Sequence, residues 1–329
     1  MESMGPAGIR AAGPAGGTDQ VELLRKQYEA LICELLGRGQ GEQAYQIADI
    51  AVAQGLWEER LHRPITLHPA TGSEPFFDPA DFWFLDLLAE NWPQVRAEID
   101  SVADPVAAGM STAGLDGSSV RGGKWHQLMF WDRGRRFERA HELFPVTAEL
   151  LSAIPEATEF GNGFVMLSWL QPGTWIAPHC GPTNSKARTH FCIRTDPKAR
   201  MRVGDQERGW KDGQSFVFDD SFEHEVWHEG DGPRVVLLID VPNPRLVDAE
   251  RVRRQDQAAW TEEMQTFMSA MQLSRVSREA EGVSTVFSEP VLEFIESYLD
   301  TRDLQAVEFR HGTLQVTPAS ASASGRQRV

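Results

Sequence analysis

Two histidines and one arginine stand at the ends of segments whose residue types favour β-strands. His179 closes one such segment and precedes a Gly-Pro turn, whereas His224 follows the turn Asp219-Asp220-Ser221. Arg234 begins an apolar run. Neutral imidazoles bind transition metals, and a guanidinium presents a planar fork that matches a carboxylate. Together the three residues could supply an iron site with open positions and an anchor for a dicarboxylate cosubstrate.

Each of these residues, taken alone, has a simpler structural explanation. A histidine at a strand end is more often hydrogen-bonded to a nearby carbonyl than bound to a metal, and an isolated Arg234 more often pairs with Asp231 or Glu229. The prediction depends on their combination. His224 follows His179 by 45 positions, enough to cross a sheet several times, and Arg234 follows ten positions later, about one strand-turn-strand step.

The string His224-Glu-Val-Trp-His228 invites a zinc-protease interpretation, which requires both histidines on one helix. Two glycines and a proline follow within five residues, and the residues between the histidines favour a strand, so we reject this interpretation. On a strand, His224 and His228 share one face. His224 is the better ligand candidate because it directly follows a turn, and we expect His228 to lie nearer to solvent.

Short strands are the elements that would position these residues. From Gly163 onward, apolar or alternating runs are separated by Gly, Pro, Asn and Asp, without helices between them. The predicted strands are Phe164–Gln171, Thr174–His179, Arg188–Ile193, Arg200–Val203, Gln214–Phe218, His224–His228 and Arg234–Val241. The pattern predicts an antiparallel sandwich or barrel, that is, a mainly β core with flanking α-helices.

The rest of the chain is predicted to surround this core. Its predicted parts are a disordered leader (1–18), an N-terminal helical hairpin (19–62), the β-barrel domain with supporting helices (63–245), a C-terminal helical extension (246–315) and a disordered tail (316–329). Within the extension, helices are predicted over Asp248–Leu273 and Pro290–Leu299.

Composition disfavours several classes of partner. Lys and Arg number 32 and Asp and Glu 48, so the formal net charge is −16, which repels nucleic acids and anionic lipids. No apolar run is long enough to span a bilayer. Three cysteines (Cys33, Cys180 and Cys192) fit no zinc spacing and suit a reducing compartment. We therefore expect a cytoplasmic protein that binds neither nucleic acid nor membrane.

Longer strings around the same residues resemble the aspartyl/asparaginyl β-hydroxylase family. They are Pro-Gly-Thr-Trp-x-x-Pro-His179-x-Gly-Pro-Thr-Asn, Arg188-Thr-His190 and Phe-Asp-Asp-Ser-Phe-Glu-His224-Glu-Val-Trp, and the resemblance runs from Trp125 to Pro244. It implies a double-stranded β-helix, a jelly-roll or cupin-like barrel. It also implies a dioxygenase that uses Fe(II), 2-oxoglutarate and O2 and releases succinate and CO2.

The resemblance implies a metal site with two protein ligands. His179 and His224 correspond to the iron ligands, and Arg234 completes the catalytic set by holding the distal carboxylate of 2-oxoglutarate. Most related oxygenases add a carboxylate two residues after the first histidine. Here that position is Gly181; the family shares this absence, and water takes the place.

Further roles follow from the same resemblance. Ser168 would donate a hydrogen bond to the distal carboxylate of the cosubstrate, and Arg188 and His190 would contact its metal-chelating end. Trp125 and Lys186 are candidate substrate contacts. For Trp125, which resembles a tryptophan near the active-site wall, core packing is an equally good explanation.

The expected substrate is an amino acid such as aspartate or asparagine, free, in a peptide or tethered to a carrier protein, with hydroxylation at the β-carbon. This expectation comes from the family and from the cation cluster of Lys186, Arg188 and His190. Two alternatives stay open. Gly181 leaves a position where chloride could bind iron, as in 2-oxoglutarate-dependent halogenases, and a non-catalytic cupin-like binding module would use the histidines for packing.

Overall fold

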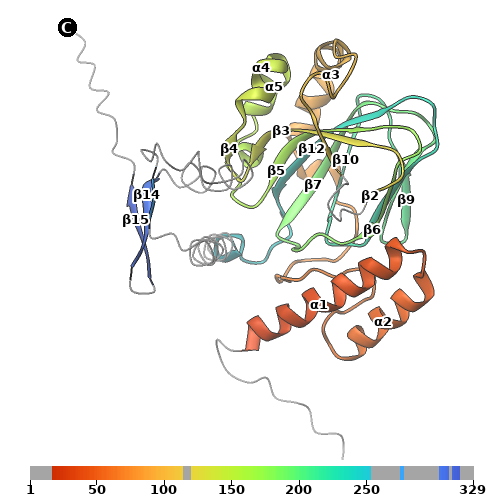
Figure 1. The fold of residues 1–329 in the computed structure, drawn as a ribbon, viewed down its shortest axis with the longest axis vertical. Helices are drawn as coiled ribbons and strands as arrows, with labels where there is room; N and C mark the ends of the chain where they lie inside the picture. Colours follow the sequence, from red (N-terminus) through yellow and green to blue (C-terminus); the bar gives the residue numbers. More distant parts are fainter. Residues whose placement is uncertain (1–16, 114–119, 253–274, 278–303, 311–312, 319–329) are drawn as a thin grey trace, which may run out of the picture.

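Two antiparallel β-sheets face each other in a computed structural model that describes residues 17–113, 120–252, 275–277, 304–310 and 313–318 (Figure 1). In the described residues, one sheet has seven strands: β1 (Ser111–Ala113), β3 (Trp125–Asp132), β4 (Arg135–Arg136), β5 (Phe164–Leu170), β7 (Lys186–Arg194), β10 (Ser215–Phe218) and β12 (Arg234–Pro242). Their order is β1-β3-β5-β12-β7-β10, with β4 paired to β3. The facing sheet, ordered β2-β6-β11-β8-β9, contains β2 (Val120–Arg121), β6 (Trp175–His179), β8 (Ala199–Val203), β9 (Gln206–Gly209) and β11 (His224–His228).

The central strands of the larger sheet are apolar on both faces because both faces are covered. Along β12, Val236 and Leu238 point into the space between the sheets, whereas Leu237 and Ile239 belong to the core on the other side. Alternation of side chains along a strand separates these two cores. The predicted mainly β barrel with flanking helices, of the jelly-roll or cupin-like class, is confirmed.

Helices cover the outer face of the larger sheet. They are α3 (Phe84–Asp100), α4 (Glu138–Leu143), α5 (Pro145–Ser152) and α6 (Pro155–Thr158), and the short 3-10 helix η1 (Pro79–Asp81) leads into α3. The carboxylate of Glu98 on α3 accepts hydrogen bonds from the Val146 and Thr147 N–H groups, both at 2.8 Å, and so caps the first turn of α5. None of the described helices is both long enough and apolar enough to cross a bilayer.

An N-terminal helical hairpin lies at the other end of the barrel from α3–α5 (Figure 1). It consists of α1 (Gly17–Gly37) and α2 (Gly41–Ala53), in the region where the sequence predicts such a hairpin. Between them Gly39 has φ = +74°, a conformation that glycine adopts without steric cost. Ile32 and Ala48, both fully buried, belong to the hairpin's own apolar core, and α1 contacts β6.

The C-terminal region differs from its prediction. β13 (Arg275–Ser277), β14 (Leu304–Arg310) and β15 (Thr313–Pro318) form a three-stranded antiparallel sheet. The predictions of a helical extension (246–315) and a disordered tail (316–329) are therefore wrong at the residues that form these strands. Alternating apolar residues such as Leu314 and Val316 favour a β-hairpin. The predicted helix Asp248–Leu273 lies outside the described residues from residue 253 onward, and the predicted helix Pro290–Leu299 lies outside them entirely.

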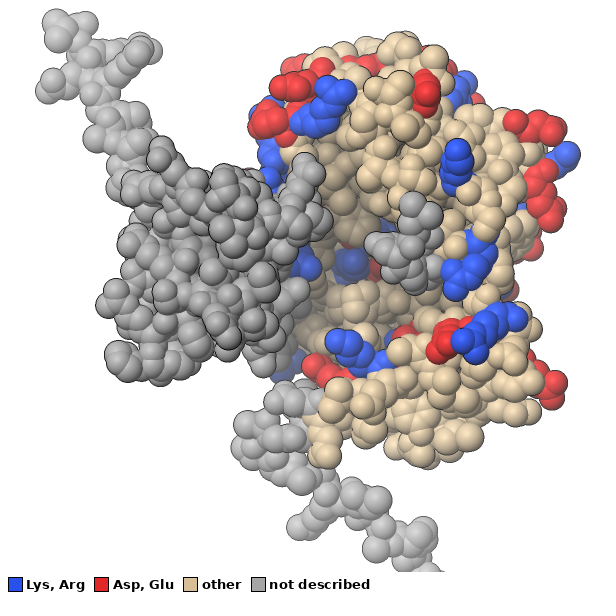
Figure 2. Space-filling view, viewed as in Figure 1, with Lys and Arg blue, Asp and Glu red and all other residues tan. Residues whose placement is uncertain are grey.

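Charge is mixed over the described surface. Figure 2 shows Lys and Arg side chains interspersed with Asp and Glu on one face, and several basic side chains in the hollow above the α1–α2 hairpin. The net charge of −16 is thus not spread evenly. An anionic ligand is not excluded from this face by the overall charge.

Candidate active site

The two predicted metal ligands lie side by side between the sheets. His179 ends β6 and His224 begins β11, and the antiparallel register pairs them directly. Their ring centroids are 4.2 Å apart, with an angle of 53° between the ring planes. An irregularity in the β6–β11 register follows His224 before Val226, and such bulges re-aim side chains at the rims of barrels.

Backbone carbonyls select the tautomer of both rings. Nδ1 of His179 lies 2.8 Å from the Ala177 carbonyl oxygen, and Nδ1 of His224 lies 2.9 Å from the Phe222 carbonyl oxygen. A carbonyl oxygen can only accept, so each Nδ1 carries the proton and donates. In the neutral rings, Nε2 is then left with its lone pair, which is the arrangement found in metal-bound histidines.

Burial keeps both imidazoles neutral. It lowers the pKa of His179, and it lowers the pKa of His224 well below its usual range, with the neighbouring His179 ring acting in the same direction. Protonation of Nε2 would block metal coordination. The pair therefore fits a metal that binds through two nitrogens, and no described group of three or more His, Cys, Asp or Glu side chains could hold a metal ion.

The space beside Gly181 is occupied by a carboxylate from another turn. A Cβ added to Gly181 would lie 2.6 Å from Cγ of Asp220 and 2.7 Å from both of its carboxylate oxygens. Oδ2 of Asp220 lies 2.9 Å from Nη1 of Arg188, whereas the buried Oδ1 has no hydrogen-bond partner among the described residues. A carboxylate thus stands beside the His179 turn without belonging to its strand.

Arg234 is a buried cation without an acidic partner among the described residues. Its guanidinium contacts Ser168 Oγ through Nη1 at 3.1 Å and lies 4.7 Å from the Trp210 ring centroid, and its Nε has no hydrogen-bond partner in the described part of the chain. Burial lowers the pKa of Arg234 to about 10. An uncompensated buried charge is costly, so the site fits an external carboxylate such as that of 2-oxoglutarate.

Ser168 has one hydrogen-bonding function left over. Its Oγ accepts from Nε1 of Trp125 at 2.8 Å and from Nη1 of Arg234 at 3.1 Å. Both lone pairs are then used, so the hydroxyl hydrogen is available to donate. This arrangement agrees with a donor to the distal carboxylate, and Trp125 orients the serine as well as packing beside it.

A strip of rings connects the histidine pair with Arg234. Phe218 lies 5.7 Å from the His224 ring and 5.0 Å from the His190 ring. Trp210 stacks on His190 at 5.9 Å and donates from Nε1 to His190 Nδ1 at 3.3 Å. Because Trp210 also contacts Arg234, the two halves of the predicted site share one interior.

The predicted cation cluster is neutralised by acids. Arg188 binds both oxygens of Asp240 at 2.8 and 2.9 Å, besides its contact with Asp220. Nζ of Lys186 lies 3.3 Å from Asp240 and 3.6 Å from Asp220. His190 is uncharged, because burial and the nearby Arg234 hold its pKa well below the usual range. The proposed contacts of Lys186 and Arg188 with ligands stay predictions.

Some site residues differ from, or go beyond, the sequence prediction. His228 is not near solvent: it is 1% exposed, and its Nε2 lies 2.6 Å from the Gly232 carbonyl oxygen. Three residues of the site interior, Trp210, Asp220 and Asp240, were not predicted as site residues. Asp220 lies within the string that ends at His224, so the sequence could have indicated it as a site residue. Trp210 and Asp240 could not be predicted as site residues without knowledge of which strands are neighbours.

Comparison with known proteins agrees with this geometry. Residues 89–244 match the family described as aspartyl/asparaginyl beta-hydroxylase. Human aspartyl/asparaginyl beta-hydroxylase is 32% identical over 219 residues, which cover 64% of this chain and 28% of that protein. Mouse aspartate beta-hydroxylase domain-containing protein 2 is 32% identical over 190 residues, covering 56% of this chain and 55% of that protein.

A bacterial relative is also similar. The ornithine lipid ester-linked acyl 2-hydroxylase of Rhizobium tropici is 26% identical over 200 residues, covering 57% of this chain and 66% of that protein. The chain thus spans less than a third of the human relative and about half to two thirds of the other two. Residues 89–244 therefore match the aspartyl/asparaginyl β-hydroxylase family, and the proteins named above are similar to the chain over this region.

Proposed function

We propose that this protein is an Fe(II)- and 2-oxoglutarate-dependent dioxygenase that hydroxylates an amino acid or an amino-acid residue. The observation that carries the proposal is that the neutral pair His179 and His224 shares one interior with the cation Arg234, which has no acidic partner among the described residues. A packing role for the histidines, as in a non-catalytic binding module, does not account for a buried guanidinium without an acid.

Different residues would bind the metal and the cosubstrate. Nε2 of His179 and of His224 would hold Fe(II), which together with 2-oxoglutarate and O2 supplies the oxidising chemistry. Arg234 and Ser168 would bind the distal carboxylate of the cosubstrate and so set its orientation. Arg234 is buried together with Phe218 and Trp210, and the low polarity of these surroundings strengthens the electrostatic attraction of the guanidinium for its ligand.

Hydroxylation is favoured over halogenation by Asp220. A halogenase would bind chloride in place of the missing carboxylate, and the space beside Gly181, where that side chain would begin, contains the Asp220 carboxylate. A second anion in that space would be repelled. We therefore expect products that gain oxygen, even in chloride buffer.

An acidic or amide amino acid is the proposed substrate class. It is supported by the family match rather than by the cations, because Lys186 and Arg188 are already paired with Asp220 and Asp240. The bacterial relative is named for an acyl group of a lipid. Assaying a fatty-acyl substrate beside the amino acids therefore tests the proposed substrate class.

The test combines binding and turnover. Anaerobic titration of the protein with Co(II), followed by 2-oxoglutarate, should show one metal site and one cosubstrate site, and both should be lost from the double variant His179→Ala/His224→Ala. With Fe(II) in place of Co(II) and with O2 admitted, succinate release should be stimulated by free or peptide-bound aspartate or asparagine. Stimulation by acyl substrates alone would contradict the substrate class, and absence of metal binding would contradict the whole proposal.

A further inference from the structure

A short segment before the matched family region lies against both turns that carry the candidate metal ligands. We call residues 61–68 the strap. The Glu223 N–H donates to the Leu61 carbonyl at 2.7 Å, and the Arg63 N–H donates to the Ser221 carbonyl at 3.2 Å. His62 and Phe222 form the bridge between these two bonds, and their rings stack at 4.2 Å. The strap thus adds a short antiparallel pairing to the turn before β11.

This pairing fixes the peptide group that orients His224. The peptide between Phe222 and Glu223 donates its N–H to Leu61, while its carbonyl accepts from Nδ1 of His224 at 2.9 Å. Rotation of that peptide plane would break both hydrogen bonds together. The direction in which Nε2 of His224 points is therefore coupled to the position of the strap.

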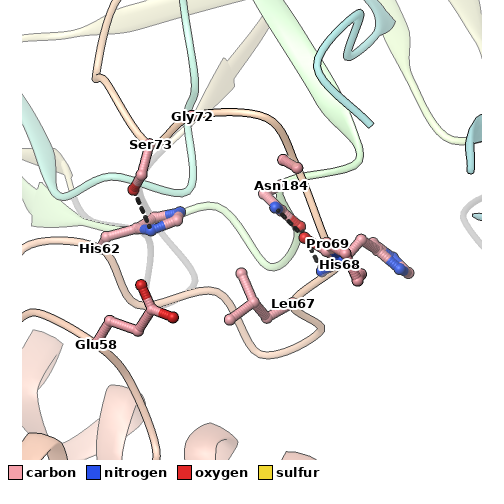
Figure 3. Close-up of a pocket in the computed structure, with 9 residues that line it drawn as sticks. Glu58, His62, Leu67, His68, Pro69, Gly72, Ser73 and Asn184 are labelled. Carbon is pink, nitrogen blue, oxygen red and sulfur yellow. Dashed lines mark hydrogen bonds between the residues drawn. The ribbon is translucent and has the colours of Figure 1, made fainter. Parts of the chain in front are cut away.

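The strap also holds the turn that follows His179. The N–H groups of Ile65 and Thr66 donate to the Pro182 carbonyl at 2.9 and 3.0 Å. The Asn184 side chain accepts from the His68 N–H and donates to its carbonyl, both at 2.8 Å. Figure 3 shows this pairing and His62, with Ser73 beside it, around a cavity of about 370 Å³. One segment thus links the two turns.

A buried arginine fixes the strap in this position. The side chain of Arg63 is 0% exposed, and it binds Glu29 of α1 through Nε at 2.6 Å and Glu223 through Nη1 at 2.9 Å. It also donates to the Arg60 carbonyl. Glu223, likewise 0% exposed, is the residue before His224. The guanidinium therefore joins the hairpin, the strap and the ligand-bearing turn.

Two further contacts hold Glu223 at this junction. Its Oε1 accepts from the Tyr45 hydroxyl of α2 and from Nη2 of Arg202, each at 2.8 Å. The pKa of Glu223 is held below its usual range by Arg63 and Arg202 against the effect of burial. Both helices of the hairpin thus reach the residue that precedes His224.

We propose that Arg63 is a positioning residue for the metal centre and that Glu29 makes the N-terminal hairpin part of that centre. Arg63 sets the strap, and the strap sets the angle at which His179 and His224 meet the metal. The proposal rests on the proposed function only in requiring that a metal binds at these two histidines.

Four variants test the proposal on the metal-loaded but substrate-free protein. They are Arg63→Met, Arg63→Lys, Glu29→Gln and the control Glu98→Gln, which removes a cap of α5 in the outer helix layer. Co(II) affinity and the visible absorption spectrum of bound Co(II) are measured anaerobically, and the melting temperature is measured without metal. These readouts need no turnover, and the control separates lost stability from lost geometry.

Weaker and altered metal binding is expected in the Arg63 and Glu29 variants and not in the control. Arg63→Met should raise the Kd for Co(II) by about 10-fold or more and change its absorption spectrum, as outer-shell changes do. Arg63→Lys should recover part of the lost affinity. Glu29→Gln keeps Arg63 in place, so it tests the proposal if Arg63→Met fails to fold, and it should raise the Kd at least about threefold. Glu98→Gln should lower the melting temperature without changing Co(II) binding.

Two results would contradict the proposal, and they can be told apart. If the unmodified protein binds no Co(II), the proposed function fails and the positioning role fails with it. If the unmodified protein binds Co(II) and Glu29→Gln and the Arg63 variants bind it with the same Kd and spectrum, only the positioning role is overturned.

Discussion

Asp220 places its carboxylate in the space into which a side chain at position 181 would project, although the two residues belong to different turns. Gly181→Asp would restore the three-residue ligand pattern of most related oxygenases. We nevertheless expect it to raise the Kd for Co(II) by about 10-fold or more, because the new Cβ would displace Asp220 from Arg188. Anaerobic titration measures the change.

A double variant supplies the control for this steric argument. Gly181→Ala should weaken metal binding in the same direction, but Gly181→Ala/Asp220→Ala should bind no worse than Asp220→Ala alone, since the contact is gone. Tighter Co(II) binding by Gly181→Asp than by the unmodified protein would show that the turn can open to admit a third ligand.

Replacement of Arg234 should change stability and cosubstrate binding in opposite directions. Arg234→Met removes a buried cation that has no acid partner among the described residues, so the ligand-free protein should be as stable or more stable. The Kd for 2-oxoglutarate should rise by about 30-fold or more, equivalent to about 2 kcal/mol. Chemical denaturation and calorimetric titration with Co(II) present measure the two effects.

Arg194→Met is a matched control for this experiment. Arg194 also lies over a tryptophan ring, at 4.7 Å from Trp169, but it pairs with Asp100 and lies on the other side of the sheet from the barrel interior. Its replacement should leave the Kd for 2-oxoglutarate unchanged. Equal loss of affinity in both variants would mean that general positive charge, rather than the Arg234 fork, attracts the cosubstrate.

The two histidines should be needed together for metal binding. His179→Ala and His224→Ala should each raise the Kd for Co(II) by at least about 100-fold, because each removes one of the two nitrogens available in the described site. His141→Phe is the control, since His141 is also a buried histidine but packs on Trp131 at 4.4 Å. Unchanged affinity in either alanine variant would place the metal elsewhere.

Asp219 should make stability depend on pH. Burial raises its pKa from the ordinary 3.8 to about 7, so the folded protein holds this proton more tightly than the unfolded chain. The contribution of Asp219 to stability is therefore complete below about pH 4 and is lost as the pH rises through about 7. Asp219→Asn cannot ionise and should gain about 1–3 kcal/mol relative to the unmodified protein between pH 5 and pH 8.

The free energy of unfolding of Asp219→Asn is compared with that of the unmodified protein at each pH, because the neighbouring His62 changes stability with pH in the opposite direction. Burial lowers the pKa of His62 to about 4, so its contribution grows as the pH rises from about 4 to about 6.5. Urea denaturation of both proteins at pH 5 and at pH 8 measures the difference, in which the effect of burial on His62 is common to the two proteins. Asp231→Asn, at a side chain that is 97% exposed, is the control and should show no such trend.

The barrel strands and the main site residues could be predicted from the chain because their signals are local. Strand propensity and turn residues located β5–β8 and β10–β12, and the strings around His179 and His224 carried the family resemblance. β3, with buried His126, Leu128 and Phe130 in alternation, carried a similar signal that was not used. The β14–β15 hairpin was predicted as helical extension and tail, although its residues also alternate.

Residue types and their spacing along the chain determined which groups can bind a metal and a carboxylate. Only the tertiary structure decided how these groups are held, because that depends on partners distant in sequence. Asp220 fills the space at Gly181, Trp210 lies between His190 and Arg234, and Arg63 reaches Glu223 across 160 positions. Burial makes such contacts decisive, since a charge removed from water must find its partner wherever the fold brings one.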